Sequence, residues 1–158
     1  MKTDCPSVVL RPAIMDDSEA IRKWRSDQRN FRYSRSAAPV DLPEHQRWMR
    51  EVLQDPQRTL LVAENDGMTV GTIRFDRHHD DPSVAEISIS VNPEQHGSGL
   101  GTSILRCALT YWQHAGGTQL LATIRTDNTP SMTLFTRAGF VTCGSTHGEW
   151  NLLMSTMS

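Results

Sequence analysis

Glycines at positions 97, 99 and 101 separate an apolar run from an amphipathic segment, within the stretch Ile87 to Leu109. Three alternating glycines remove the β-carbons from a turn, so backbone N–H groups can come close to a bound anion. A helix that begins there adds the partial positive charge of its N-terminus. The spacing therefore predicts a phosphate cradle, although a plain glycine turn between a strand and a helix fits the same residues.

Two common phosphate loops do not match this stretch. A dinucleotide loop has a third glycine three residues after the second, but Thr102 stands there, and no acidic residue follows about 20 positions later to hold a ribose. A nucleoside-triphosphate loop ends in Gly-Lys-Ser/Thr, but Gly101 is followed directly by Thr102. Neither ligand class is favoured.

A carboxylate and two hydroxyls precede the glycines at every second position. On a strand they share one face, and Ile87, Ile89 and Val91 share the other. The polar set is Glu86, Ser88 and Ser90. Glu86 is thus a candidate base that deprotonates an amine, directly or through water. A strand-end carboxylate in solvent, or one paired with Arg74 on a neighbouring strand, explains the same residue.

The glycine run resembles motif A of the GNAT superfamily of N-acetyltransferases, Arg/Gln-x-x-Gly-x-Gly/Ala, with His96 in the first place. The stretch Asn128 to Phe140 resembles a second GNAT pattern, Asn-x-x-Ala/Ser-x-x-Leu-Tyr/Phe-x-x-x-Gly-Phe. The resemblance implies acetyl-CoA as cosubstrate and no metal. It implies the cofactor-binding residues Ile89, Ser90, Val91, His96, Gly97, Ser98, Gly99, Leu100, Gly101, Thr102, Asn128, Ser131 and Phe135.

Phe135 stands where many GNAT members carry a tyrosine that protonates the departing thiolate. Phenylalanine cannot donate a proton. An alkyl thiol has a pKa near 8.5, so its thiolate can leave at neutral pH and take a proton from water. The resemblance also implies that a backbone N–H at Ser90 or Val91 stabilises the oxyanion.

The N-terminal third resembles the GNAT branch that acetylates amino groups on nucleotide-linked sugars, which has a Trp-Arg-Asn-Asp-like turn and a His-x-x-Trp pair. Aromatic rings can stack on a base or sugar, and arginines can pair with a diphosphate. Tryptophans at helical spacing also fit a core, and arginines a solvated surface. The implied substrate-binding residues are Trp24, Arg25, Arg32, His45, Trp48, Arg74 and Ser88.

Other acceptors stay open, namely a protein N-terminus, a polyamine or an antibiotic amine. A non-catalytic domain that binds acyl-CoA is the alternative to an enzyme. In either case we expect a small-molecule ligand, and family precedent makes a homodimer an option.

The periodicity predicts one domain over residues 1–158, with its core at about 8–154. It belongs to the α/β class, with a mixed, mostly antiparallel sheet flanked by helices, as in the GNAT fold. Expected strands are 8–12, 59–64, 69–76, 84–91, 119–124, 140–143 and 149–154. Expected helices begin near 15 and cover 42–53, 99–114 and 130–137, with Asp16 or Asp17 capping the first and Asp41 the second.

The composition excludes several functions. The chain has 158 residues and a formal net charge of −2, whereas proteins that track nucleic-acid phosphates are usually basic. No run approaches the roughly 18 apolar residues of a membrane span, and the first residues lack the apolar stretch of a signal peptide. We therefore expect a cytoplasmic protein without a nucleic-acid or membrane partner.

Cysteines and histidines give no further site. Cys5, Cys107 and Cys143 form no Cys-x-x-Cys pair and leave an odd thiol, which fits a reduced compartment. His78 and His79 adjoin two aspartates, but adjacent side chains on an extended segment point to opposite sides. We expect a solvated hairpin loop there and no metal.

Overall fold

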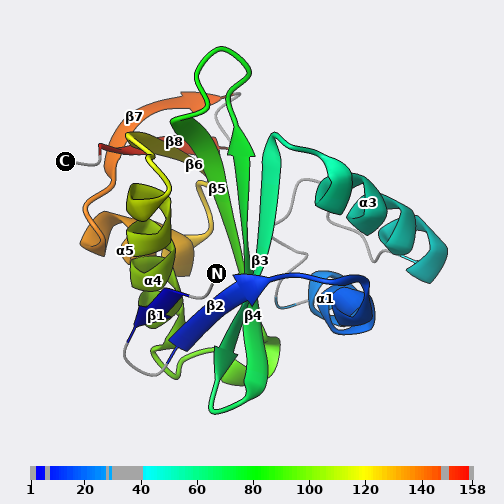
Figure 1. Ribbon diagram of the computed structural model, residues 1–158. Helices are drawn as coiled ribbons and strands as arrows, with labels where there is room; N and C mark the ends of the chain where they lie inside the picture. The colour runs from blue at the N-terminus through cyan, green and yellow to red at the C-terminus, as the bar shows by residue number, and fades with distance from the viewer. Residues whose placement is uncertain (1–2, 6–7, 28, 30–40, 147–149, 157–158) are drawn as a thin grey trace.

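The computed structural model describes residues 3–5, 8–27, 29, 41–146 and 150–156. Figure 1 shows the strands and helices of the described chain. The elements are β1 (Thr3–Cys5), β2 (Val8–Pro12), η1 (Met15–Asp17), α1 (Ser18–Ser26), α3 (Leu42–Gln54), β3 (Arg58–Asn65), β4 (Met68–Arg77), β5 (Val84–Val91), η2 (Pro93–Gln95), α4 (Leu100–His114), β6 (Gln119–Arg125), α5 (Thr129–Arg137), β7 (Val141–Thr146) and β8 (Trp150–Thr156).

Eight strands of the described chain form one sheet in the order β1-β2-β3-β4-β5-β6-β8-β7. Every neighbouring pair is antiparallel except β5 and β6, which run parallel. The predicted α/β class with a mixed, mostly antiparallel sheet is confirmed. The short strand β1 was not expected, because three residues carry too little periodicity to indicate a strand.

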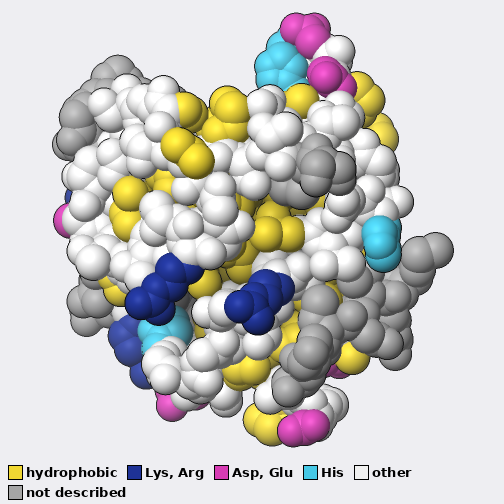
Figure 2. Space-filling model, turned by 90° about the vertical axis from the view of Figure 1, so that its left-hand side faces the viewer, with side chains coloured by type: hydrophobic (Ala, Val, Ile, Leu, Met, Phe, Trp, Pro, Cys, Tyr) yellow, Lys and Arg dark blue, Asp and Glu magenta, His cyan; other side chains and the backbone are white. Residues whose placement is uncertain are grey.

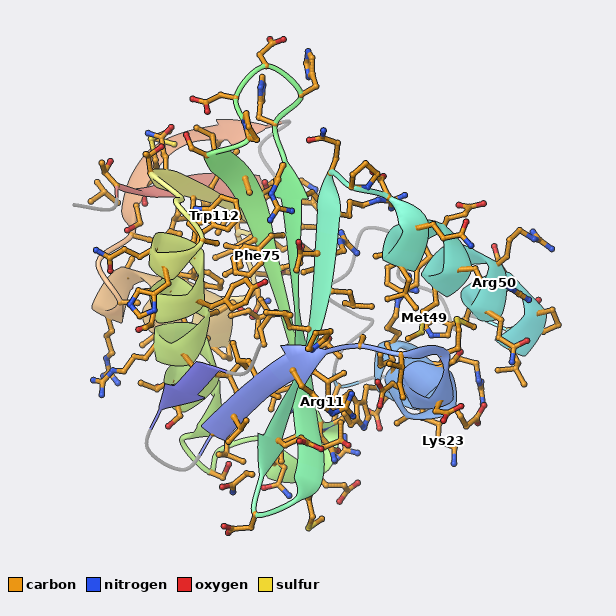
Figure 3. The ribbon with its side chains drawn as sticks, viewed as in Figure 1. Arg11, Lys23, Met49, Arg50, Phe75 and Trp112 are labelled. Carbon is orange, nitrogen blue, oxygen red and sulfur yellow. The ribbon has the colours of Figure 1, made fainter. Side chains whose placement is uncertain are left out.

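Helices cover both faces of the sheet, with α4 and α5 on one side and α1 and α3 on the other (Figure 1). The larger apolar core lies between the sheet and α4, where Phe75 stacks on Trp112 with ring centroids 4.9 Å apart. Figure 3 shows these two rings between α4 and the central strands. A smaller core lies under α1 and α3 and contains Ala13, Ile21, Trp24, Met49, Val52, Leu60 and Val62.

A polar anchor fixes the start of α1 on the sheet. Arg11 on β2 donates to both carboxylate oxygens of Asp17, at 2.9 and 2.7 Å. The backbone N–H of Ile14 donates to the same carboxylate at 2.9 Å. Burial alone would raise the pKa of Asp17, but these bonds hold it below its usual value. Asp17 thus occupies the N-cap position of α1 without making the side-chain cap expected from the sequence.

The hairpin and cap signals otherwise place the elements correctly. Asp66 and Gly67 both have positive φ, 52° and 79°, in the tight turn between β3 and β4. Asp41 accepts from the Glu44 N–H at 2.9 Å and begins α3. No helix of the described residues is long and apolar enough to cross a membrane.

Candidate active site

The glycine loop has the backbone conformation that a cradle requires. Gly97 and Gly99 have φ of 81° and 84°, a left-handed conformation that costs other residues about 1–2 kcal/mol. Gly99 is the N-cap of α4, and the first N–H groups of a helix have no carbonyl partner within it. The Ser103 N–H reaches back to the Gly99 carbonyl at 3.4 Å. The Leu100 N–H donates to the Ser98 hydroxyl at 3.4 Å, and the start of α4 beside the glycines is where a helix end can bind an anion.

A polar network holds the segment in front of the cradle. Arg29 donates to both carboxylate oxygens of Asp27, at 2.9 and 2.8 Å, and to Glu94 Oε1 at 3.0 Å. The hydrogen bonds from Arg29 lower the pKa of Asp27 to about 2. Glu94 lies in η2, directly before His96 and the glycines. This network ties the end of α1 to the cradle across 65 residues, and no sequence signal pairs residues so far apart.

Strand β5 leaves β6 just beside the cradle. Their parallel ladder joins Val84 to Gln119 and ends at Glu86 opposite Leu121. The rest of β5 continues to Val91 along β4 alone. Strand β5 therefore separates from β6 after Glu86, before the chain reaches the glycine loop.

The second motif forms the N-terminus of α5 and part of the core. The Asn128 side chain accepts from the Ser131 N–H at 3.3 Å and caps the helix. Phe135 is buried and packs edge-to-face on Phe140, with centroids 4.9 Å apart. Phe135 therefore fills the core from its own helix, and Tyr111, which stacks on Phe75 at 5.8 Å, is likewise a packing residue.

Glu86 lies half-buried on the face of β5 that points toward α1 and α3. Its cross-strand partner is Asp76, and the next residue on the same face, Ser88, lies opposite Arg74. Arg74 donates its Nε to Asp76 at 3.0 Å. The arginine considered as a partner for Glu86 is thus held by the aspartate two positions along its own strand.

Two arginines converge on one indole over this face. The guanidinium carbon of Arg25, from α1, lies 4.4 Å from the ring centroid of Trp48 on α3. That of Arg74, from β4, lies 5.6 Å from the same ring. Burial first, and the charge of Arg74 second, lower the pKa of Arg25. The fold therefore brings together, from three elements, residues that the sequence assigned to substrate binding.

His45 contacts both Arg25 and Trp48 of this cluster. Its ring is completely buried and lies 5.4 Å from the Trp48 ring, and its Nδ1 is 3.2 Å from Nη1 of Arg25. Burial, followed by the charges of Arg25 and Arg22, lowers the pKa of His45 to about 4. His45 is therefore neutral at pH 7, and its Nδ1 accepts the hydrogen bond from Arg25.

The sequence that contains the cradle and the arginine cluster is similar to a known protein family. Residues 7–141 match the profile of the acetyltransferase (GNAT) domain. The chain belongs to the GNAT family. The matched range contains the cradle and the Asn128 cap. It also contains Arg25, Trp48 and Arg74.

Individual relatives carry several acetyltransferase names. The chain is 33% identical over 96 residues to a mycothiol acetyltransferase of Pseudarthrobacter chlorophenolicus. The matched segment covers 58% of this chain and 30% of that protein. It is 31% identical over 150 residues to a Bacillus subtilis protein provisionally named phosphinothricin acetyltransferase. That match covers 92% of this chain and 86% of the relative. The chain spans less than half the length of the mycothiol acetyltransferases that it matches.

Solved structures share the fold at lower identity. The spermidine N-acetyltransferase from Vibrio cholerae, in complex with CoA and spermine, superposes with a TM-score of 0.86 over 96% of each chain at 16% identity. This likeness establishes the GNAT fold for the whole described sheet with its helices.

Not every expected site residue of this GNAT chain reaches the site. Trp24 is only 8% exposed and lies in the smaller core. Arg32 falls outside the described residues. The sequence also missed Asp76, which holds Arg74; its position two residues along the strand, on the same face, was the available signal.

The loop between β4 and β5 corrects one geometric expectation. His78 and His79 do not point to opposite sides; their rings stack with centroids 4.8 Å apart. The chain turns here instead of staying extended, because the Asp81 N–H bonds to the His78 carbonyl at 3.3 Å. Ligand atoms of His78, His79 and Asp80 lie within 4.8 Å of one another on this exposed tip, where Figure 2 shows histidine and acidic side chains gathered.

Proposed function

We propose that this GNAT chain transfers the acetyl group of acetyl-CoA to the primary amine of a small molecule, and that a nucleotide-linked amino sugar is the preferred acceptor. One observation carries the proposal. Glu86 and Ser88 lie on β5, the strand that precedes the glycine loop, and on the sheet face where Arg25 and Arg74 approach one indole. A site with those two neighbours is suited to a reaction between two substrates.

The cradle supplies the acetyl-CoA side. The N–H groups around Gly97, Gly99 and the first turn of α4 would bind the pyrophosphate. Asn128, at the start of α5, would contact the pantetheine arm. Names of relatives agree with this half of the proposal, since all the proteins compared above are acetyltransferases by name and one solved neighbour contains CoA.

The chemical step needs a neutral amine and a stabilised oxyanion. Glu86 would accept a proton from the ammonium group of the acceptor, directly or through one water. The amine nitrogen then attacks the thioester carbonyl, and a β5 N–H at Ser90 or Val91 donates to the oxyanion. The carbon–nitrogen bond forms, the carbon–sulfur bond breaks and the nitrogen releases its remaining extra proton to water, while the thiolate takes a proton from solvent because Phe135 has none to give.

The acceptor side of the proposed site offers an aromatic ring and positively charged side chains. Trp48 offers an aromatic face that can stack on a base or sugar, and Arg25 and Arg74 offer positive charge for a diphosphate. A polyamine carries only positive charge and would be repelled by the same pair. This contrast favours a nucleotide-linked sugar over the polyamine named for one structural neighbour.

Thiol release tests the enzymatic claim. Purified protein is mixed with acetyl-CoA and a panel that contains nucleotide-linked amino sugars, spermine, an aminoglycoside, phosphinothricin and an N-terminal peptide. General-base catalysis contributes about 10²–10⁴-fold, so Glu86→Gln should lose at least 100-fold in kcat/KM on the accepted amine. Glu51→Gln, a matched change on the exposed side of α3, should keep full activity.

Two results would contradict the proposal. Acetyl-CoA binding without turnover above Glu86→Gln on any amine would indicate the non-catalytic acyl-CoA-binding alternative. Turnover on spermine with no stabilisation by nucleotide-linked amino sugars in a thermal-shift assay would reject the acceptor assignment.

A further inference from the structure

Arg25 and Arg74 lie close enough for their charges to interact. They come from α1 and β4 and approach the same Trp48 ring, at 4.4 and 5.6 Å. Their like charges act on one another, since Arg74 contributes to lowering the pKa of Arg25. Bringing two partly buried guanidinium groups together costs free energy unless other groups compensate.

The compensation within the described residues is incomplete. Asp76 accepts from Nε of Arg74 at 3.0 and 3.1 Å, which leaves the terminal nitrogens of Arg74 available. Arg25 donates to the neutral ring of His45 at 3.2 Å, and Glu44 acts on Arg25 only at a distance. Within the described residues, no carboxylate therefore bonds to Arg25 or to the terminal nitrogens of Arg74, on the face that carries Ser88 and Glu86.

We infer that Arg25 and Arg74 form a preorganised anion subsite on the face of Trp48, and that buried His45 is the positioning residue that holds Arg25 in it. The inference deepens the proposed function and rests on it for the identity of the ligand, a phosphate or diphosphate group of the acceptor. Guanidinium groups match such oxygens in a bidentate manner.

His45 suits this role because it is an acceptor that carries no charge. A carboxylate in its place would pair with Arg25 and cancel the charge that the ligand needs. A neutral imidazole fixes the guanidinium through Nδ1 and leaves its charge intact. Complete burial of the ring excludes direct contact with the acceptor, so its effect must pass through Arg25.

Inorganic pyrophosphate is the probe, titrated by calorimetry into protein saturated with CoA. CoA occupies the glycine cradle first, so heat from pyrophosphate reports a second site. Losing one charge-assisted contact weakens binding by about tenfold or more. We expect that loss in Arg25→Met and in Arg74→Met, and binding within twofold of wild type in Arg50→Met, whose side chain extends from the outer side of α3 (Figure 3).

The role of His45 is tested by a pair of variants. His45→Leu removes the acceptor and should weaken pyrophosphate binding by about fivefold, while His45→Gln keeps a neutral carbonyl acceptor and should restore most of it. Neither should change the affinity for CoA, because His45 lies on α3 and the proposed CoA cradle lies at the start of α4. A general packing defect would instead affect both variants and both ligands.

The outcomes separate this inference from the proposed function. Equal pyrophosphate affinity in wild type, Arg25→Met and Arg74→Met, or no binding at 10-fold the concentration that saturates a nucleotide sugar, overturns the subsite. Pyrophosphate binding that depends on both arginines in a protein without amine turnover supports the subsite and rejects the catalytic proposal alone.

Discussion

The two faces of the sheet carry different kinds of side chain. On the α4 side, the inward residues of β4 and β5 are apolar, and Phe75 stacks on Trp112 in one continuous core. On the α1 and α3 side, the same strands present Arg74, Asp76, Glu86 and Ser88, and only a smaller cluster of seven buried apolar residues remains. One pair of neighbouring strands thus supports a dry face and a polar face.

This difference follows from the period of a strand. Alternate side chains point to opposite faces, so β5 can pack Ile87 against α4 while it presents Glu86 to the other layer. The dry face gives rigidity to the cradle, because α4 is packed along its length by Ile104, Leu105 and Trp112. The polar face holds groups that are costly to bury, as expected where chemistry and recognition occur.

The largest expected effect lies on the dry face. Phe75→Ala removes a fully buried ring that stacks on both Trp112 and Tyr111. Phenylalanine-to-alanine changes in cores cost about 3–5 kcal/mol, so the free energy of unfolding in urea should fall by that amount. A loss below about 1 kcal/mol would contradict the assignment of this face as the main core. The exposed change Met68→Ala is the control, since its side chain is 61% exposed.

The second effect concerns a titration on the polar face. The pKa of His45 is about 4 in the folded protein against 6.5 for a free side chain, so the unfolded chain binds more protons between these values. Stability is then complete above pH 6.5 and is lost as pH falls toward 4, by about 3 kcal/mol. Arg25, Arg22 and Glu19 are the charges that face this ring.

Urea unfolding at pH 7 and pH 4.5 measures this loss. Wild type should lose more stability than His45→Gln over that interval, because glutamine does not titrate. His114→Gln, at the exposed end of α4, provides the comparison and should behave as wild type. Equal pH dependence in all three proteins would show that His45 is not held neutral by burial.

Sequence reasoning succeeded where the signal was local. Asp41 caps the helix that its position predicted, and the glycines at 97 and 99 form a turn before a helix, where both have positive φ. Turns and caps depend on a few consecutive residues. The order of strands was also accessible, because alternation and tight turns constrain a meander.

It failed where partners are distant in the chain or where burial decides. Arg29 and Glu94 lie 65 residues apart, and nothing in either local stretch indicates the other. Arg74 was considered for Glu86, although register places it opposite Ser88 and its own strand supplies Asp76. His45 was grouped with contact residues, and only the packed structure shows that its ring is fully buried.

Met49 in the smaller core can be compared with Phe75 in the larger core. Met49 is completely buried and, in Figure 3, lies on the inner side of α3. Met49→Ala should cost about 2 kcal/mol, the lower end for such changes, because a small cluster beside a polar surface can collapse into the gap. The same variant should raise KM for the amine acceptor through Trp48 and leave KM for acetyl-CoA unchanged. A loss as large as that of Phe75→Ala would mean that the two cores are equivalent.

The smallest expected effect compares two helix caps, one on each face. Asp41 bonds to the Glu44 N–H at 2.9 Å, and Asn128 bonds to the Ser131 N–H at 3.3 Å. Replacing either by alanine should cost about 1 kcal/mol of unfolding free energy. Their kinetics should differ, because only Asn128 lies beside the proposed pantetheine path. Asn128→Ala should raise KM for acetyl-CoA severalfold, while Asp41→Ala changes it by less than twofold. Since the two caps have the same local chemistry, equal kinetics would place the cofactor elsewhere than along α5, whatever the stability data show.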